Sequence, residues 1–167
     1  MSLLAIRRFP DPILKRPTRP IERVDEMTRR LINAMVKTMR QHPHCVGLAA
    51  PQVGSDLCVA VMDSSVHPKG VDSRGLTVLV NPELLDAEGQ VTGREGCLSV
   101  PDFTGNVRRA ARVHLRALDR DGEPFSCWLE GFEAIVAQHE VDHLDGKLFL
   151  DRVANTATDV FRRKSYG

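Results

Sequence analysis

The sequence has almost no excess charge of either sign and no long apolar run. Its 23 basic and 22 acidic residues nearly cancel, so no overall field would draw the chain to nucleic acid or to an anionic membrane surface. No apolar stretch approaches the roughly 18 residues of a membrane-spanning helix, and the first residues do not resemble a secretory signal. These absences predict a cytoplasmic protein with no membrane partner and no direct nucleic-acid partner.

Cysteine is sparse, and no two cysteines form a C-x-x-C pair. Cys45, Cys58, Cys97 and Cys127 lie far apart in the sequence. In a reducing compartment they would be free thiols or metal ligands rather than disulfides. The 167 residues, of which 42% are apolar, suffice for one hydrophobic core, so we expect a single domain over residues 1–167.

The first half of the chain predicts one helix and two strands. Four prolines between residues 10 and 20 favour an extended, non-helical segment that wraps the surface. Asp25 is a candidate cap for an amphipathic helix that ends before Pro43 and whose apolar stripe begins at Met27. The expected elements that follow are a turn at 47–52 and strands at 57–62 and 76–80.

The second half predicts a hairpin and a second helix. Residues 113–118 and 125–129 have extended patterns on either side of an Asp-Gly turn. From Gly131 to Gly146 the pattern is helical, with two histidines on what we interpret as a buried stripe. The basic tail at 160–164 is expected to be a solvated end. This order of elements indicates an α+β domain.

The second predicted helix contains His139-Glu140-Val141-Asp142-His143, a His-Glu-x-x-His motif. A four-residue step turns a helix by roughly 400°, so the two imidazoles lie one turn apart and can bind one ion. Glu140 follows His139 by about 100° of rotation, which suits a general base acting on a water held by that ion. The predicted reaction class is metal-assisted hydrolysis. Two core histidines satisfied by hydrogen bonds are the alternative interpretation.

A catalytic metal site usually has three protein ligands, and the motif supplies only two. On spacing alone, Asp142, Asp145 and all four cysteines remain candidates for the third. Cys97 lies in the segment 95–101, where Gly96 permits unusual backbone angles and Pro101 is expected to end a strand. That setting is suited to presenting a thiolate, but it does not select Cys97 by itself.

Three segments together resemble the signature motifs of the peptide deformylase family. They are residues 46–52 (VGLAAPQ), 95–99 (EGCLS) and 138–144 (QHEVDHL), in the family's order, and the resemblance extends up to about Arg152. It implies one peptide deformylase-like catalytic domain in which short antiparallel β-sheets surround a central C-terminal helix carrying the motif. It also implies the family's activity, which is removal of the formyl group from the N-terminal methionine of nascent proteins with release of formate.

The resemblance further implies the cofactor and the ligands. Cys97, His139 and His143 would bind one divalent metal ion, natively Fe²⁺, with Zn²⁺, Ni²⁺ or Co²⁺ able to replace it. Glu140 would move the proton, and Gln52 with the Leu98 backbone N–H would form the oxyanion hole. The residues implied around the substrate are Val46, Gly47, Phe132, Ile135 and Val136. For the last three, packing in the core is an equal alternative.

Three further features have two interpretations each. Glu95 and Arg109 are either a pair that supports the metal site or a surface ion pair. Cys45 stands where the family's first motif usually has glycine, so its side chain would narrow the cleft or shift the backbone. It could instead form an extra metal or redox site with His42 and His44, although histidines in a proline-broken loop are usually exposed.

Two rival functions remain open, and the C-terminal tail bears on contact with the ribosome. A general zinc peptidase normally takes its third ligand from a later Glu or His, but residues 144–167 contain neither. A metal-stabilised module that binds formylated termini without cleaving them would have no use for Glu140. The tail beyond Arg152 lacks the long basic helix of some relatives, so at most a transient contact with the ribosome is expected.

Overall fold

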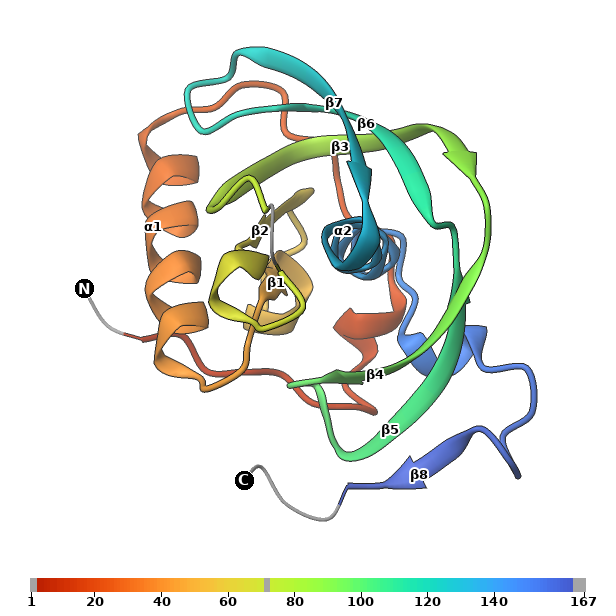
Figure 1. The fold of residues 1–167 in the computed structure, drawn as a ribbon. Coiled ribbons are helices and arrows are strands. Elements are labelled where there is room, and N and C mark those ends of the chain that lie inside the picture. The colour runs from red at the N-terminus through yellow and green to blue at the C-terminus, as the bar shows by residue number, and fades with distance from the viewer. Residues whose placement is uncertain (1–2, 71–72, 164–167) are drawn as a thin grey trace.

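The computed structural model describes residues 3–70 and 73–163, and Lys164 of the basic tail lies outside them. Two antiparallel sheets and two α-helices make an α+β architecture, as expected (Figure 1). The larger sheet has the order β1-β2-β3-β6-β7 and the smaller one the order β4-β5-β8. The helices and strands are α1 (Glu26–Gln41), β1 (Gly47–Ala49), β2 (Val59–Met62), β3 (Thr77–Glu88), β4 (Val91–Cys97), β5 (Val100–Arg109), β6 (Arg112–Leu118), β7 (Pro124–Glu130), α2 (Gly131–Leu144) and β8 (Val160–Arg162).

Helix α1 confirms the predicted capped, amphipathic helix. The Asp25 carboxylate accepts the backbone N–H of Thr28 at 2.9 Å, which satisfies a donor left open at the helix start. Ile32, Met35 and Met39 are buried against the larger sheet. The expected stripe is wrong at Met27, which is 74% exposed.

The larger sheet confirms the two strands and the hairpin of the prediction. Strands β6 and β7 pair in register from Arg112 opposite Glu130 to Leu118 opposite Pro124, and Gly122 occupies the turn with φ +82°. Strand β3 is longer than expected, and its register with β6 shifts between Val80 and Glu83. The expected turn at 47–52 is wrong in part, since strand β1 comes first and a 3₁₀ turn, Ala50–Val53, follows it.

Strands β4 and β5, which no periodicity had indicated, form an antiparallel pair in the smaller sheet. Pro101 lies inside β5 and does not end a strand, and Gly96 has an ordinary φ. The tail is not a free end, because β8 pairs with β5 through Phe161 opposite Thr104. The pairing of β8 with β5 joins segments that are far apart in the sequence.

The proline-rich start also departs in part from the expected surface segment. It contains a 3₁₀ turn, Pro12–Lys15, which is compatible with proline because the first N–H of a helical turn has no partner to lose. Leu14 in this turn is fully buried and packs with Leu148 and Phe149. Leu14 is therefore part of the core beneath the smaller sheet, while most of the segment is exposed as expected.

Helix α2 contacts β1, β2, β6 and β7, and Figure 1 shows it end-on inside the curve of the strands. Ala134, Ala137 and Val141 pack into the core of the larger sheet. Phe132 and Ile135, which we had placed on a buried stripe, are only half-buried. Among the described residues no helix has the length and apolarity to span a membrane.

Candidate metal centre and active site

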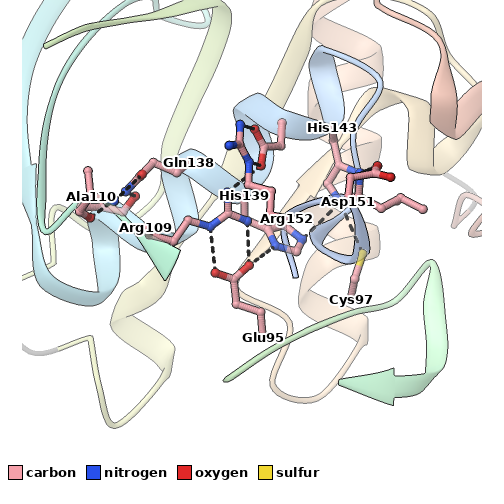
Figure 2. Close-up of polar contacts among 12 residues, drawn as sticks. Glu95, Cys97, Arg109, Ala110, Gln138, His139, His143, Asp151 and Arg152 are labelled. Carbon is pink, nitrogen blue, oxygen red and sulfur yellow. Dashed lines mark hydrogen bonds and ion pairs between the residues drawn. The ribbon is translucent and has the colours of Figure 1, made fainter. Parts of the chain in front are cut away.

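Cys97, His139 and His143 come together from two different elements. Cys97 is the last residue of β4, and the histidines lie one turn apart on α2 (Figure 2). The Cys97 Sγ lies 3.3 Å from Nε2 of His143, which lies 3.2 Å from Nε2 of His139. Cys97 and His143 are buried, and His139 is nearly so. Of the residues that the structure describes, these three form the only such group of potential ligands.

The Glu95 carboxylate orients the imidazole ring of His139. Its Oε1 lies 2.9 Å from Nδ1 of His139, and both of its oxygens accept N–H groups of Arg109 at 2.8 Å. Burial would raise the pKa of Glu95, but the hydrogen bonds from Arg109 and His139 hold it at about 2. The Glu95–Arg109 pair is buried, so the interpretation as a surface ion pair is wrong.

Asp142, a candidate third ligand, has other partners. It accepts Nη1 of Arg109 at 2.5 Å and two guanidinium N–H groups of Arg152 at 2.6 and 2.7 Å. Asp145 is exposed. Neither carboxylate therefore joins the cluster. Arg152 was not predicted from the sequence as part of the site. It follows the helix in a 3₁₀ turn, Phe149–Arg152, and no local sequence pattern indicates that it pairs with Asp142.

Glu140 lies beside the cluster and faces Gly47. A Cβ built on Gly47 would come within 2.4 Å of the Glu140 Oε2, so only glycine leaves room for this carboxylate. Burial raises the pKa of Glu140 to about 7. Its Oε1 is buried and has no hydrogen-bond partner, as expected of a group that binds a water or a substrate.

The amide of Gln52 is fixed with its nitrogen toward the cluster. Its Oε1 accepts the Ala49 backbone N–H at 3.0 Å, which assigns the orientation of the amide. Nε2 then donates to the Cys97 Sγ at 3.3 Å and to the Ser99 Oγ at 3.1 Å. Gln52 is 2% exposed and belongs to the 3₁₀ turn after β1.

A cleft of about 1270 Å³ opens over the cluster. Phe132 at its wall is flanked by His67, with ring centroids 4.7 Å apart, and by Lys69. Neither residue was indicated by the sequence, because they follow strand β2 and reach α2 only through the fold. The cleft is also lined by the expected oxyanion and substrate residues, which are Gln52, Leu98, Val46, Gly47, Phe132, Ile135 and Val136.

Cys45 fits the backbone without strain. The positive φ in this loop belongs to His44, at 66°, and the Cys45 thiol donates to the Gly47 carbonyl at 3.2 Å. Burial raises the pKa of Cys45 to about 12, so it remains a thiol at neutral pH. No metal-ligating group that includes His42, His44 or Cys45 is found among the described residues.

The geometry of the three side chains fits a divalent cation. A tetrahedral ion about 2.0–2.1 Å from two imidazole nitrogens would separate them by roughly 3.3 Å, close to the 3.2 Å between the two Nε2 atoms. Because Glu95 accepts from Nδ1 of His139, the neutral form of that ring would present the lone pair of Nε2 to the cluster. Two nitrogens and one thiolate suit a borderline-soft metal.

Comparison with known proteins assigns the family. The family model described as polypeptide deformylase matches residues 3–159. The peptide deformylase of Alkalilimnicola ehrlichii is 46% identical over 98% of this chain and 89% of its own length, and that of Azotobacter vinelandii is 45% identical over 98% and 95%. A crystal structure of a peptide deformylase from Legionella pneumophila superposes with a TM-score of 0.83, at 41% identity over 92% of this chain and 87% of that one.

A second solved structure is that of a relative with a bound peptide. The peptide deformylase of Acinetobacter baumannii bound to Met-Ala-Ser superposes with a TM-score of 0.84, at 37% identity over 91% of this chain and 99% of that one. These matches cover nearly the whole length on both sides, so the likeness is not confined to the motifs. The family resemblance is therefore confirmed, and this chain belongs to the polypeptide deformylase family.

Proposed function

We propose that residues 1–167 form one catalytic domain that removes the formyl group from the N-terminal methionine of nascent proteins, releasing formate. The observation that carries this function is the convergence of Cys97, His139 and His143 beside Glu140 at the base of a cleft. The relative that binds Met-Ala-Ser supports an N-terminal methionyl peptide as the occupant of that cleft.

The metal is proposed from the donor set. Cys97, His139 and His143 would hold one divalent cation, natively Fe²⁺, with Zn²⁺, Ni²⁺ or Co²⁺ able to replace it. When bound, such an ion acts as a Lewis acid on a carbonyl and lowers the pKa of a bound water toward about 7. The thiolate of Cys97 contributes the negative charge that distinguishes this set from one of neutral imidazoles.

Glu140 is proposed to take the proton of the attacking water and to pass it to the departing amine. Its pKa of about 7 suits both steps, because a group that both gains and loses a proton works best near the ambient pH. Gly47 leaves the space that this carboxylate occupies. The unpartnered Oε1 is the atom we assign to the water.

Gln52 and Leu98 are proposed to stabilise the former formyl oxygen as negative charge develops on it. The Gln52 Nε2 already points toward the cluster, and Leu98 directly follows the ligand Cys97. A donor held in place before the reaction is typically worth about 2.7–4 kcal/mol in the transition state. Gln52 is neutral, so this contribution does not change with pH.

The methionine side chain is proposed to lie among Val46, Phe132, Ile135 and Val136, with Gly47 contacting the substrate backbone. All five residues line the cleft, and apolar walls suit a thioether. We further propose that the protein acts in the cytoplasm and touches the ribosome only transiently. Strand β8, which follows Arg152, is paired within the fold and does not extend a helix away from it.

Formate release from formyl-Met-Ala-Ser is the direct test. Protein purified without oxygen and assayed for bound metal should release formate, and Glu140→Ala should retain the metal but lose nearly all turnover. Near-native turnover in Glu140→Ala would remove the proposed proton carrier. Cleavage of internal peptide bonds would favour a general peptidase, and binding of the formyl peptide without turnover would favour a recognition module.

A further inference from the structure

The cleft continues past the metal centre along β4. This strand is one of the two edge strands of the smaller sheet (Figure 1). The lining of the cleft follows β4 from Cys97 back through Gly96, Arg94 and Gly93 to Val91. At about 3.3 Å per residue these six steps span roughly 20 Å, which is much longer than a formylmethionine. A peptide held at Cys97 by its first residue therefore has room to lay its following residues beside β4.

Arg94 is held in this part of the cleft by an aromatic ring. Its guanidinium carbon lies 3.8 Å from the ring centroid of Phe161, which strand β8 places there. In the part of the chain that the structure describes, the guanidinium of Arg94 makes no hydrogen bond and no ion pair. Stacking restrains the plane of the guanidinium and leaves the N–H donors along its edge open to a carboxylate.

The carboxylates that line the cleft do not neutralise Arg94. Glu95 is bound to Arg109, and Glu140 is buried beside the cluster. Glu130, at the far end of the cleft, lies 3.9 Å from Arg112. Glu95 and Glu130 are therefore paired with other arginines, and Glu140 lies beside the cluster.

Further cations line the same cleft, and they are Lys69, Arg112 and Arg163. Lys69 lies 6.0 Å from the ring centroid of Phe132, and no ion pair of its ammonium is found among the described residues. The whole chain carries a net charge of only +1. The positive charge is thus a local property of the cleft and would act on the part of the substrate that follows the methionine.

We propose that Arg94 is a specificity residue that binds an acidic side chain at the third or fourth residue of the formylmethionyl substrate. Arg94 is three residues from Cys97, or about 10 Å along the strand, and an extended peptide covers that distance in three residues. This inference rests on the proposed function. It means that the chain deformylates nascent proteins with an acidic start faster than neutral or basic ones.

The test compares formyl-Met-Ala-Glu-Glu-amide with the Gln-Gln and Lys-Lys peptides of the same length. The amide removes the terminal carboxylate, so that only side chains can supply the anion. We expect kcat/KM for the Glu peptide to exceed that for the Gln peptide about three- to fivefold at low salt, with the Lys peptide below both. The preference should shrink when the salt is raised from about 0.05 M to about 0.5 M.

Variants assign the preference to one side chain. Arg94→Gln should bring the Glu-to-Gln ratio close to one, and Arg94→Glu should favour the Lys peptide. Phe161→Leu keeps the charge but removes the ring, so the ratio should fall part of the way. Arg108→Gln is the matched control, because Arg108 is an exposed cation of the neighbouring strand that does not line the cleft, and it should keep the ratio.

Any of three results would overturn this inference. They are a Glu-to-Gln ratio near one in the unaltered protein, a ratio that survives in Arg94→Gln, and a ratio that falls equally in Arg108→Gln. Formate release from all three peptides at equal rates would leave the proposed function standing while removing the role of Arg94. Absence of formate from every peptide would instead remove the proposed function itself.

Discussion

The carboxylate of Glu95 lies 2.9 Å from Nδ1 of His139 and binds Arg109 through both of its oxygens. This contact favours an N–H at Nδ1 of His139, and in the neutral ring that proton position leaves the lone pair of Nε2 directed at Cys97 and His143. The geometry of the proposed ligands is therefore supported by buried charges.

Glu95→Gln should weaken metal binding about 10- to 100-fold, because the neutral amide supports the imidazole less well and leaves Arg109 poorly compensated. Competition with a coloured chelator measures the affinity. Glu130→Gln, an acid of the cleft rim that does not touch a ligand, is the control. Equal affinities in Glu95→Gln and the unaltered chain would show that His139 needs no such support.

Glu95 should also make the free energy of unfolding depend on pH. Because hydrogen bonds outweigh burial and hold the pKa of Glu95 at about 2, its ionised form is favoured in the folded state. That stabilisation is complete above the ordinary pKa of a glutamate and is lost as the pH falls from about 5 to about 2. Urea unfolding across this range should show a steeper loss in the unaltered chain than in Glu95→Gln. Parallel curves would contradict the assignment.

Gly47→Ala should lower kcat at least about 100-fold, since the new Cβ would come within 2.4 Å of the Glu140 Oε2 and displace the proposed proton carrier. Metal content should not change, because no ligand moves. Gly93→Ala is the matched control, as it lies in the same cleft and its Cβ would meet nothing within 4 Å. A Gly47→Ala protein with full activity would separate Glu140 from the reaction.

Asp142→Asn should cost about 3 kcal/mol of unfolding free energy, because it removes the negative partner of a buried guanidinium. Burial opposes ionisation of Asp142, but hydrogen bonds from Arg152 and Arg109 lower its pKa. Asp145→Asn changes a nearby exposed carboxylate and should leave stability within about 0.5 kcal/mol. Denaturant titration of both variants makes the comparison, and equal stabilities would mean that the network around Asp142 is not stabilising.

Local patterns predicted the parts of this molecule that depend on local physics. The Asp25 cap and the spacing of Met35 and Met39 are properties of one helix, and the hairpin follows from its Asp-Gly turn. The two histidines share a side of α2 because four residues make about one turn. These elements could be located without knowledge of the rest of the fold.

Contacts between distant segments could not be predicted from local sequence patterns. Spacing left six candidates for the third ligand, and only the family resemblance selected Cys97, which β4 brings to α2 from 42 residues earlier than His139. The pairing of Arg152 with Asp142 and of β8 with β5 left no periodic signal. Leu14 was assigned to the surface because prolines indicate where a helix cannot form and say nothing of burial.

The central claim is that one divalent cation is bound by Cys97, His139 and His143. Diffraction from crystals of the protein purified without oxygen, recorded on both sides of the absorption edge of the metal found in solution, tests it most directly. We expect a single anomalous peak within bonding distance of the Cys97 Sγ and the Nε2 atoms of His139 and His143. A peak elsewhere, or a stoichiometric metal with the Cys97 Sγ turned away from it, would contradict the account.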